Sequence, residues 1–137
     1  MTQYTSYDLI EWGKPFQKRK KTLPKPTSAE VLVRVTAAGL CHSDLHVQKG
    51  FMDLGEEGKL TFSERGAELP MTFGHEIAGI VEAIGPEASM VNIGQQVLVF
   101  PWIGCGKCEA CKKENETLCE APKYLGARLN GGYSDHI

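Results

Sequence analysis

The chain has 137 residues, with 15 Lys and Arg against 17 Asp and Glu and a net charge of −2. This length suits one domain with a buried core, and the balanced charge offers no field for nucleic acid or an anionic membrane. No apolar run approaches the roughly 20 residues of a membrane span, and residues 1–4 lack the basic and apolar regions of a secretory signal. We therefore expect a cytoplasmic protein without nucleic-acid or membrane partners.

The first half of the chain predicts strands and one short helix. Residues 4–12 and 16–23 indicate a hairpin, and the cationic run 18–21 within it is typical of a solvated strand edge. Residues 43–47 would form one or two helical turns. Alternation over 31–37 predicts a strand with four apolar side chains on one face: Val31, Val33, Val35 and Ala37.

Residues 50–69 interrupt the strand pattern. They are polar, and Gly55, Gly58 and Gly66 stand among five acidic residues. A structureless loop of this length is uncommon in a compact domain and is usually functional. We expect it to be such a loop.

The second half of the chain again predicts mainly strands. Residues 77–84 and 96–100 are rich in β-branched residues and bounded by Gly or Pro, whereas 109–113 would form a short helix. Asn130-Gly131 predicts a turn before a last strand over 133–137. Many short strands with frequent turns indicate a mainly β domain, either barrel-like or a sandwich.

Four cysteines stand close together, with two, two and seven residues between neighbours: Cys105, Cys108, Cys111 and Cys119. Two disulfides within this one short loop would be strained, and clustered cysteines in a chain without an export signal favour metal ligation. Four thiolates make the closed tetrahedral site that structural zinc prefers. The sequence therefore predicts a structural-zinc lobe over residues 102–120.

A second group of possible ligands is dispersed in sequence. Cys41 and His75 each stand beside a predicted strand, and catalytic zinc needs only three protein ligands. Asp44 and Glu76 are candidates for carboxylates that orient a ligand imidazole. From residue types alone, a buried structural cysteine and a structural histidine remain alternatives.

Three motifs occur in order: Gly39-Leu40-Cys41-His42-Ser43-Asp44; then Gly74-His75-Glu76-Ile77-Ala78-Gly79 followed by Gly85 and Val91; then the four-cysteine lobe. Gly131-Gly132-Tyr133 follows them. With this order and spacing, essentially the whole chain resembles the zinc-dependent alcohol dehydrogenases of the medium-chain dehydrogenase/reductase family. The resemblance implies that residues 1–137 are a GroES-like, barrel-like β domain with short helices, the N-terminal portion of the catalytic domain.

The resemblance also implies two zinc ions, one catalytic and one structural. Cys41 and His75 would bind the catalytic zinc, and the four lobe cysteines the structural one. Asp44 would hydrogen-bond His75, and Glu76 would lie close behind the metal. The full-length enzyme would oxidise an alcohol to an aldehyde or ketone, or catalyse the reverse, with NAD or NADP, and would be a homodimer or homotetramer.

Four further residues acquire roles from the resemblance. Ser43 would lie near the alcohol oxygen and pass its proton, through a cofactor ribose hydroxyl, to His46. His42 would contact the cofactor pyrophosphate, and Trp102 would line the substrate pocket. Plainer alternatives are surface positions for both histidines and, for Ser43 before Asp44, an N-cap pair that opens a short helix.

The chain departs from the family pattern in two ways. It stops at Ile137, before the family's third catalytic-zinc ligand and its nucleotide-binding domain, and no Gly-x-Gly-x-x-Gly follows a predicted strand. We therefore expect the 137-residue chain alone to be inactive. The loop over 50–69 is also longer than in many family members, and we expect it to overhang the substrate mouth.

Two other functional interpretations remain. In the first, the cysteine lobe is a stand-alone zinc module that binds a partner or nucleic acid. Modules that bind nucleic acid carry a basic surplus, but the lysines of this lobe are matched by glutamates. A β domain used only for assembly would leave the group of Cys41, His75 and Glu76 without a role.

Overall fold

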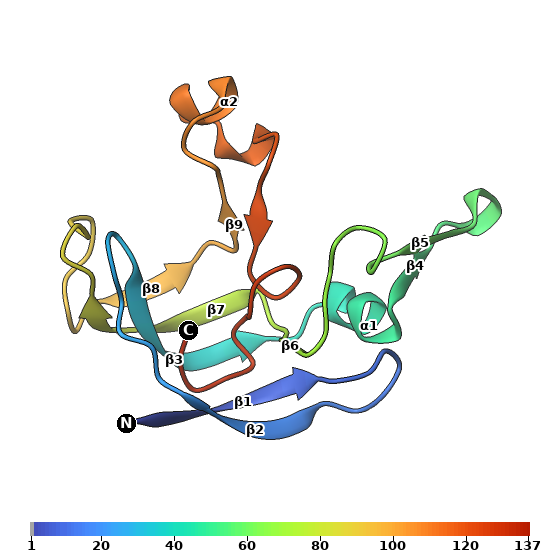
Figure 1. The fold of residues 1–137 in the computed structure, drawn as a ribbon, viewed down its shortest axis with the longest axis horizontal. Coiled ribbons are helices and arrows are strands. Elements are labelled where there is room, and N and C mark those ends of the chain that lie inside the picture. Colours follow the sequence, from blue (N-terminus) through green and yellow to red (C-terminus); the bar gives the residue numbers. More distant parts are fainter. Residues whose placement is uncertain (1) are drawn as a thin grey trace.

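The body of the molecule consists of two three-stranded antiparallel sheets, from which a cysteine lobe (orange) and a hairpin arm (green) project (Figure 1). This computed structural model describes residues 2–137. Within this range, no helix is both long and apolar enough to cross a membrane.

The first sheet has the order β2-β1-β6 and is formed by β1 (Gln3–Leu9), β2 (Gln17–Thr22) and β6 (Met71–Thr72). The register runs from Gln3 opposite Thr22 to Asp8 opposite Gln17, which confirms the predicted hairpin. The cationic run lies on β2 at the sheet edge, where residues 18–20 are exposed. Exposed charges on an edge strand oppose pairing with another chain, as predicted.

Lys21 is the one member of this run that turns toward a buried carboxylate. Its Nζ lies 2.8 Å from Oδ2 of Asp8 and 2.9 Å from Oγ1 of Thr72. The Asp8 side chain is only 1% exposed. Burial raises the pKa of Asp8, but the hydrogen bonds from Lys21 and Thr72 outweigh this effect and lower the pKa below its usual value.

We expect Lys21→Met to lower the free energy of unfolding by about 3–5 kcal/mol at neutral pH, because Asp8 is left charged and buried. The folded-state pKa of Asp8 is depressed, so its stabilising contribution is present above the unfolded pKa and is lost as the pH falls. The deficit of the variant should therefore narrow below about pH 4. Urea unfolding at pH values between neutral and about 3 measures the loss of unfolding free energy, with the exposed Lys20→Met as the control. A loss that is equally large at low pH would refute the role of the Asp8 charge.

The second sheet has the order β3-β7-β8 and contains β3 (Val31–Gly39), β7 (Glu76–Ile84) and β8 (Gln96–Val99). The prediction of one apolar face along β3 is wrong beyond Val35. Val35 pairs with Gly79 but Ala37 pairs with Ala78, so one residue of β3 bulges out. Ala78 and Gly79 are consecutive in β7 and therefore lie on opposite faces of the sheet. Their partners Ala37 and Val35 lie on opposite faces for the same reason.

Residues 133–137 join the two sheets. The Asp135 N–H donates to Thr5 O of β1 (2.9 Å), and the Ile137 N–H donates to Val33 O of β3 (2.9 Å). The predicted regular strand is therefore wrong: the segment makes isolated bridges because its hydrogen bonds alternate between two sheets. The turn that precedes it lies at 126–128, ahead of the predicted Asn130-Gly131.

After β3, α1 (His42–Lys49) leads into a hairpin arm made of β4 (Phe51–Asp53), the 3-10 turn η1 (Gly55–Glu57) and β5 (Lys59–Thr61). The prediction of a structureless loop over 50–69 is wrong. Phe51 pairs with Thr61, and the glycines of the segment adopt the positive φ angles of its turns. The arm extends away from the body beside α1 (Figure 1).

The cysteine lobe stands on a two-stranded stem of β9 (Trp102–Ile103) and β10 (Lys123–Tyr124), and α2 (Glu109–Lys112) and the 3-10 turn η2 (Glu116–Leu118) lie at its tip. The stem extends the lobe to Tyr124, beyond the predicted end at Glu120. The short helix predicted over 109–113 is confirmed as α2.

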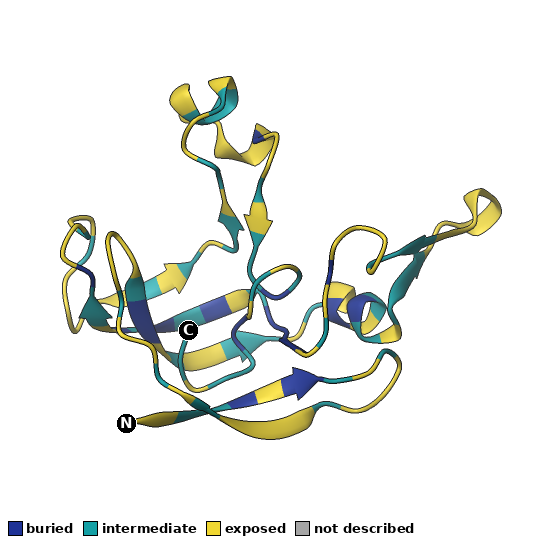
Figure 2. Ribbon diagram, in the orientation of Figure 1, coloured by how far each residue is buried: buried dark blue, intermediate teal, exposed yellow. Residues whose placement is uncertain are grey.

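The core lies in the body, and the two projections are largely exposed (Figure 2). Its central cluster joins β1, α1, β6 and the β6–β7 connection through four buried side chains: Leu9, Val47, Met71 and Phe73. Several partly buried aromatic residues, including Tyr133 of the closing segment, pack against this cluster. The core thus holds α1 against the start of β7, where the candidate ligands meet.

Candidate metal centres

The pairing of β3 with β7 brings the dispersed ligands together. Gly39 at the end of β3 pairs with Glu76 at the start of β7, so Cys41 and His75 become neighbours. A Cβ on Gly39 would collide with the Glu76 carboxylate, so glycine permits this close approach. A Cys41 sulfur, a His75 nitrogen and a Glu76 oxygen lie within 4.8 Å of one another.

These three donors fit a zinc ion. Zinc accepts thiolate, imidazole and carboxylate at about 2.0–2.3 Å, which places tetrahedral ligand atoms roughly 3.5 Å apart. Donors that already converge within 4.8 Å need only a small inward adjustment of their side chains. Zinc is usually four-coordinate, so three donors leave one position for a further ligand or a substrate.

Asp44 lies behind this group and is buried, with its side chain 2% exposed. Its Oδ1 is 3.5 Å from Nδ1 of His75, and its Oδ2 accepts the Cys41 backbone N–H at 3.0 Å. A carboxylate facing Nδ1 leaves Nε2 as the imidazole nitrogen available to a metal. Helix α1 begins with Cys41 as its N-cap, so the alternative of a Ser43–Asp44 N-cap pair is wrong.

A cavity of about 470 Å³ reaches His75 and Glu76. Apart from these two residues, its wall is apolar and includes Ile77 of β7, Leu98 of β8 and Phe100, which follows β8. This volume is within the range of small-molecule sites, which are usually apolar with a few convergent polar groups.

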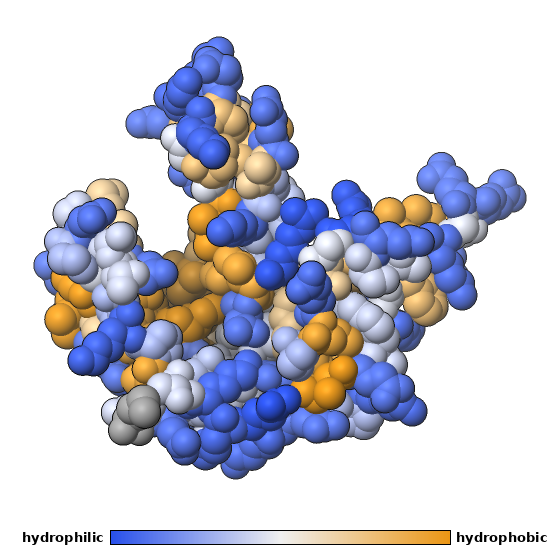
Figure 3. All heavy atoms as spheres, viewed as in Figure 1, coloured by the Kyte–Doolittle hydropathy of each residue, from blue (hydrophilic) through white to orange (hydrophobic). Residues whose placement is uncertain are grey.

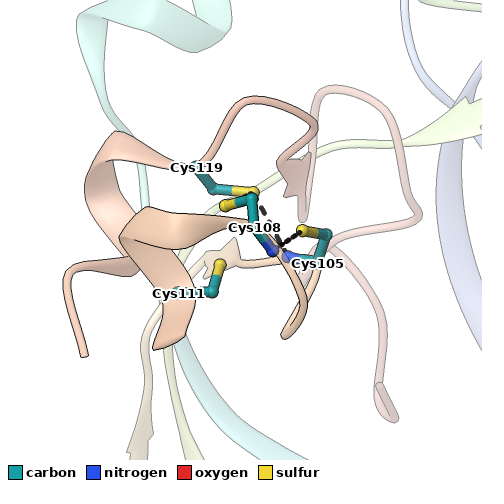
Figure 4. Close-up of side chains that lie close together, drawn as sticks. All are labelled: Cys105, Cys108, Cys111 and Cys119. Atoms are coloured by element: carbon teal, nitrogen blue, oxygen red, sulfur yellow. Dashed lines mark hydrogen bonds between the residues drawn. The ribbon is translucent and has the colours of Figure 1, made fainter. Parts of the chain in front are cut away.

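The four lobe cysteines also converge (Figure 4), with their sulfur atoms all within 4.8 Å of one another. All are free thiols, and the 4.0 Å between Sγ of Cys108 and Sγ of Cys119 is far from a disulfide bond. Backbone N–H groups point at the sulfurs; for example, the Cys105 N–H donates to Sγ of Cys119 at 3.2 Å. A Cβ on Gly104 would come within 2.8 Å of Sγ of Cys111, so glycine leaves room for the cluster.

The protonation of these thiols differs with their surroundings. Backbone hydrogen bonds lower the pKa of Cys108 to about 6, whereas desolvation by burial raises the pKa of Cys111 to about 12. Several thiolates at this distance repel one another, and a divalent cation between them removes the repulsion. Four converging sulfurs supported by N–H donors fit a closed zinc site.

A family model described as the alcohol dehydrogenase GroES-like domain matches residues 27–137. The chain belongs to the alcohol dehydrogenase GroES-like domain family. This membership and the observed architecture confirm the predicted mainly β, GroES-like fold.

Relatives of this GroES-like domain include the NAD-dependent alcohol dehydrogenase of Saccharolobus solfataricus, 41% identical over 130 residues, which cover 94% of this chain and 36% of the relative. The structure of the Aeropyrum pernix alcohol dehydrogenase matches with a TM-score of 0.82 and 27% identity, covering 97% of this chain and 36% of that one. The cobalt- and zinc-bound alcohol dehydrogenase of Pyrobaculum aerophilum matches with a TM-score of 0.81 and 25% identity, covering 99% and 39%. The chain spans about a third of the length of these relatives.

Helix α1 carries the three residues that are expected to move the proton or to contact the cofactor: His42, Ser43 and His46. Oγ of Ser43 is 3.5 Å from Sγ of Cys41, which sets this hydroxyl beside the donor group. His46 follows one turn later and is half-buried. The rings of His42 and His46 lie 4.8 Å apart, as expected for positions i and i+4 of one helix.

Trp102 lies in the stem of the lobe. Its indole N–H donates to Glu116 O at 2.8 Å, and its ring meets Tyr124 edge-on at 4.4 Å between centroids. The cavity at His75 is lined by Pro101, the preceding residue, and the described lining does not extend to Trp102. The structure therefore brings Trp102 next to this cavity but not into it.

Tyr133 is a residue of the site to which sequence reasoning assigned no role. Its hydroxyl donates to Oδ2 of Asp44 at 2.8 Å. Burial raises the pKa of Tyr133, and the hydrogen bond to Asp44 raises it further, so the hydroxyl stays protonated and acts as a donor. The Gly131-Gly132-Tyr133 motif indicated the position, but the contact depends on how the closing segment folds back over α1.

Proposed function

We propose that this chain is the N-terminal catalytic-domain portion of a zinc-dependent alcohol dehydrogenase that transfers hydride between an alcohol and NAD or NADP. The proposal depends on the convergence of Cys41, His75 and Glu76 beside a cavity. The names of the relatives support it. A stand-alone zinc module would use the lobe alone and would leave this second group of donors unexplained.

The chain provides donors for two zinc ions. Cys41, His75 and Glu76 would hold the catalytic ion, and the four lobe cysteines would hold the structural one. Bound at the first site, zinc would supply Lewis-acid polarisation of the alcohol or carbonyl oxygen. Asp44 would keep the His75 ring in the orientation that this site requires.

The residues of α1 would handle the proton and the cofactor. The Ser43 hydroxyl lies beside Cys41 and would relay the proton that the alcohol loses, accepting it while giving its own proton onward toward His46. His46 would release a proton to solvent, because an imidazole can accept a proton at one ring nitrogen and donate one from the other. His42, exposed at the first position of α1, would contact the pyrophosphate of the cofactor.

The substrate would be a small alcohol or carbonyl compound. The apolar wall of the cavity at His75 would hold its hydrocarbon part, and Trp102 would border it from the lobe side. The overall charge of −2 supports a small-molecule substrate rather than nucleic acid or a membrane. A cytoplasmic location belongs to the same proposal.

Exposed apolar surface supports packing against a further part of the enzyme. A groove of about 500 Å³ runs beside the edge strand β8 and has a mainly apolar lining. Figure 3 shows apolar surface gathered in the hollow between the lobe and the end of the body that carries β8. Ile103 in this lining is 41% exposed. We propose that the complete enzyme covers this surface, and that it is a homodimer or homotetramer.

A chimera tests the proposed activity. Residues 1–137 would replace the matching segment of the Saccharolobus solfataricus enzyme, which supplies the remaining two thirds of a complete chain. We expect the chimera to reduce NAD when given an alcohol, whereas the 137-residue chain alone should show no turnover. The unmodified Saccharolobus solfataricus enzyme is the control. A folded chimera that holds two zinc ions per subunit yet oxidises none of a broad series of alcohols would refute the proposal.

A further inference from the structure

Tyr133 contacts all three segments that contribute to the Cys41–His75–Glu76 group. Its hydroxyl lies between two acceptors, Oδ2 of Asp44 at 2.8 Å and Gly39 O at 3.2 Å. Gly39 ends β3 and precedes Cys41 by two residues, while Asp44 lies in the first turn of α1. One hydroxyl thus links the end of β3 to the start of α1.

The ring of Tyr133 contacts the third segment, the backbone that leads into His75. A Cβ on Gly74 would come within 2.6 Å of Cδ1 of this ring, and Gly74 has a φ of +91°, a conformation that side-chain-bearing residues rarely adopt. Gly74 immediately precedes His75. The Tyr133 backbone N–H also donates to Phe73 O at 2.8 Å, so both the backbone and the ring of Tyr133 hold this segment.

The two carboxylate oxygens of Asp44 have separate partners. Oδ2 accepts the Tyr133 hydroxyl at 2.8 Å and the Cys41 N–H at 3.0 Å. Oδ1 faces Nδ1 of His75 at 3.5 Å. With Oδ2 held by two donors, the carboxylate cannot rotate without breaking hydrogen bonds in a buried position, where their loss is costly.

We infer that Tyr133 is a positioning residue for the metal centre: it holds Asp44 so that Oδ1 faces His75, and it seats the backbone beside His75. The inference rests on the zinc centre proposed above. Tyr133 itself touches neither the proposed ion nor the substrate and acts through Asp44 and Gly74.

Tyr133→Phe tests this role because it removes the hydroxyl and keeps the ring against Gly74. Loss of an outer partner of a metal ligand commonly lowers metal affinity about 10–100-fold, and we expect a loss of this size at the Cys41–His75 site alone. Chelator competition measures the zinc affinity of both sites in the chimera described above, and the absorption spectrum of Co²⁺ reports coordination geometry. Tyr7→Phe, at a position 47% exposed on β1, is the matched control.

A double-mutant cycle with Asp44→Asn separates positioning from general stability. If Tyr133 acts through Asp44, the two losses of affinity should be less than additive, because the residues are in direct contact. Binding of zinc by the lobe alone in the chimera without these substitutions would refute the proposed centre, and the inference with it. Two bound zinc ions, with affinity and Co²⁺ spectrum unchanged by Tyr133→Phe, would refute the inference alone. An equal loss at both sites would also refute it, since that pattern indicates general destabilisation.

Discussion

Cys41→Ser in the chimera is expected to lower kcat/KM for alcohol oxidation by about 1,000-fold or more. Cys41 provides the only sulfur in the group with His75 and Glu76, and a hydroxyl is a much poorer zinc ligand than a thiolate. Lewis-acid polarisation is worth several kcal/mol, and about 4 kcal/mol corresponds to a factor near 1,000. Absorbance of the reduced nicotinamide gives the rate.

The zinc content of the Cys41→Ser chimera tests whether the loss of activity comes from loss of the catalytic zinc. We expect it to fall from two ions to one per subunit, because the lobe is a separate group of four cysteines. Leu40→Ala is the control, since Leu40 adjoins Cys41 in sequence and is 72% exposed. A Cys41→Ser chimera that keeps both ions and most of its activity would refute the assignment of Cys41 as a ligand.

Cys111→Ser is expected to remove the lobe zinc and to unfold the lobe locally. Between Trp102 and Tyr124, Cys119 is the only buried residue, so the described lobe has almost no apolar core of its own (Figure 2). Structural zinc binding is worth about 10–16 kcal/mol in small zinc domains, so one ligand of four corresponds to about 3 kcal/mol, or more than 100-fold in affinity. The ion would therefore supply most of the folding free energy of the lobe.

Limited proteolysis and zinc content measure this effect together. The Cys111→Ser chain should lose one zinc ion and become readily cleaved within residues 102–124, while the body stays intact. Lys107→Ser, at an exposed position in the same loop, should behave like the unmodified chain. A Cys111→Ser lobe that stays resistant to protease without its zinc would contradict the expectation.

Much of the fold follows from local patterns in the sequence. The hairpin of β1 and β2, the strands β7 and β8 and the helix α2 lie where alternation and turn residues predicted them. These patterns succeed because β1 pairs with β2 and β7 with β8, the strands that follow them in the chain, and because α2 spans few residues. The arm over 50–69 was missed because its three-residue strands are too short to show a period of two.

Long-range pairing explains the other differences. The bulge in β3 depends on its register with β7, which lies some 40 residues away in the chain. The closing segment divides its hydrogen bonds between β1 and β3, and no local pattern encodes two distant partners. Both features place residues of the site: the first precedes Cys41, and the second contains Tyr133.

The sequence by itself determined which residues can bind metal, because the spacing of the four cysteines and the types at Cys41 and His75 are chemical properties of the chain. Only the tertiary structure decided which of them meet. It brought the Glu76 carboxylate into the same group as Cys41 and His75, and it placed Trp102 outside the adjoining cavity. It also placed Tyr133 against Asp44 and Gly74. The physical reason is that these contacts depend on strand register and on close approach at glycines, which are set only when distant segments pack together.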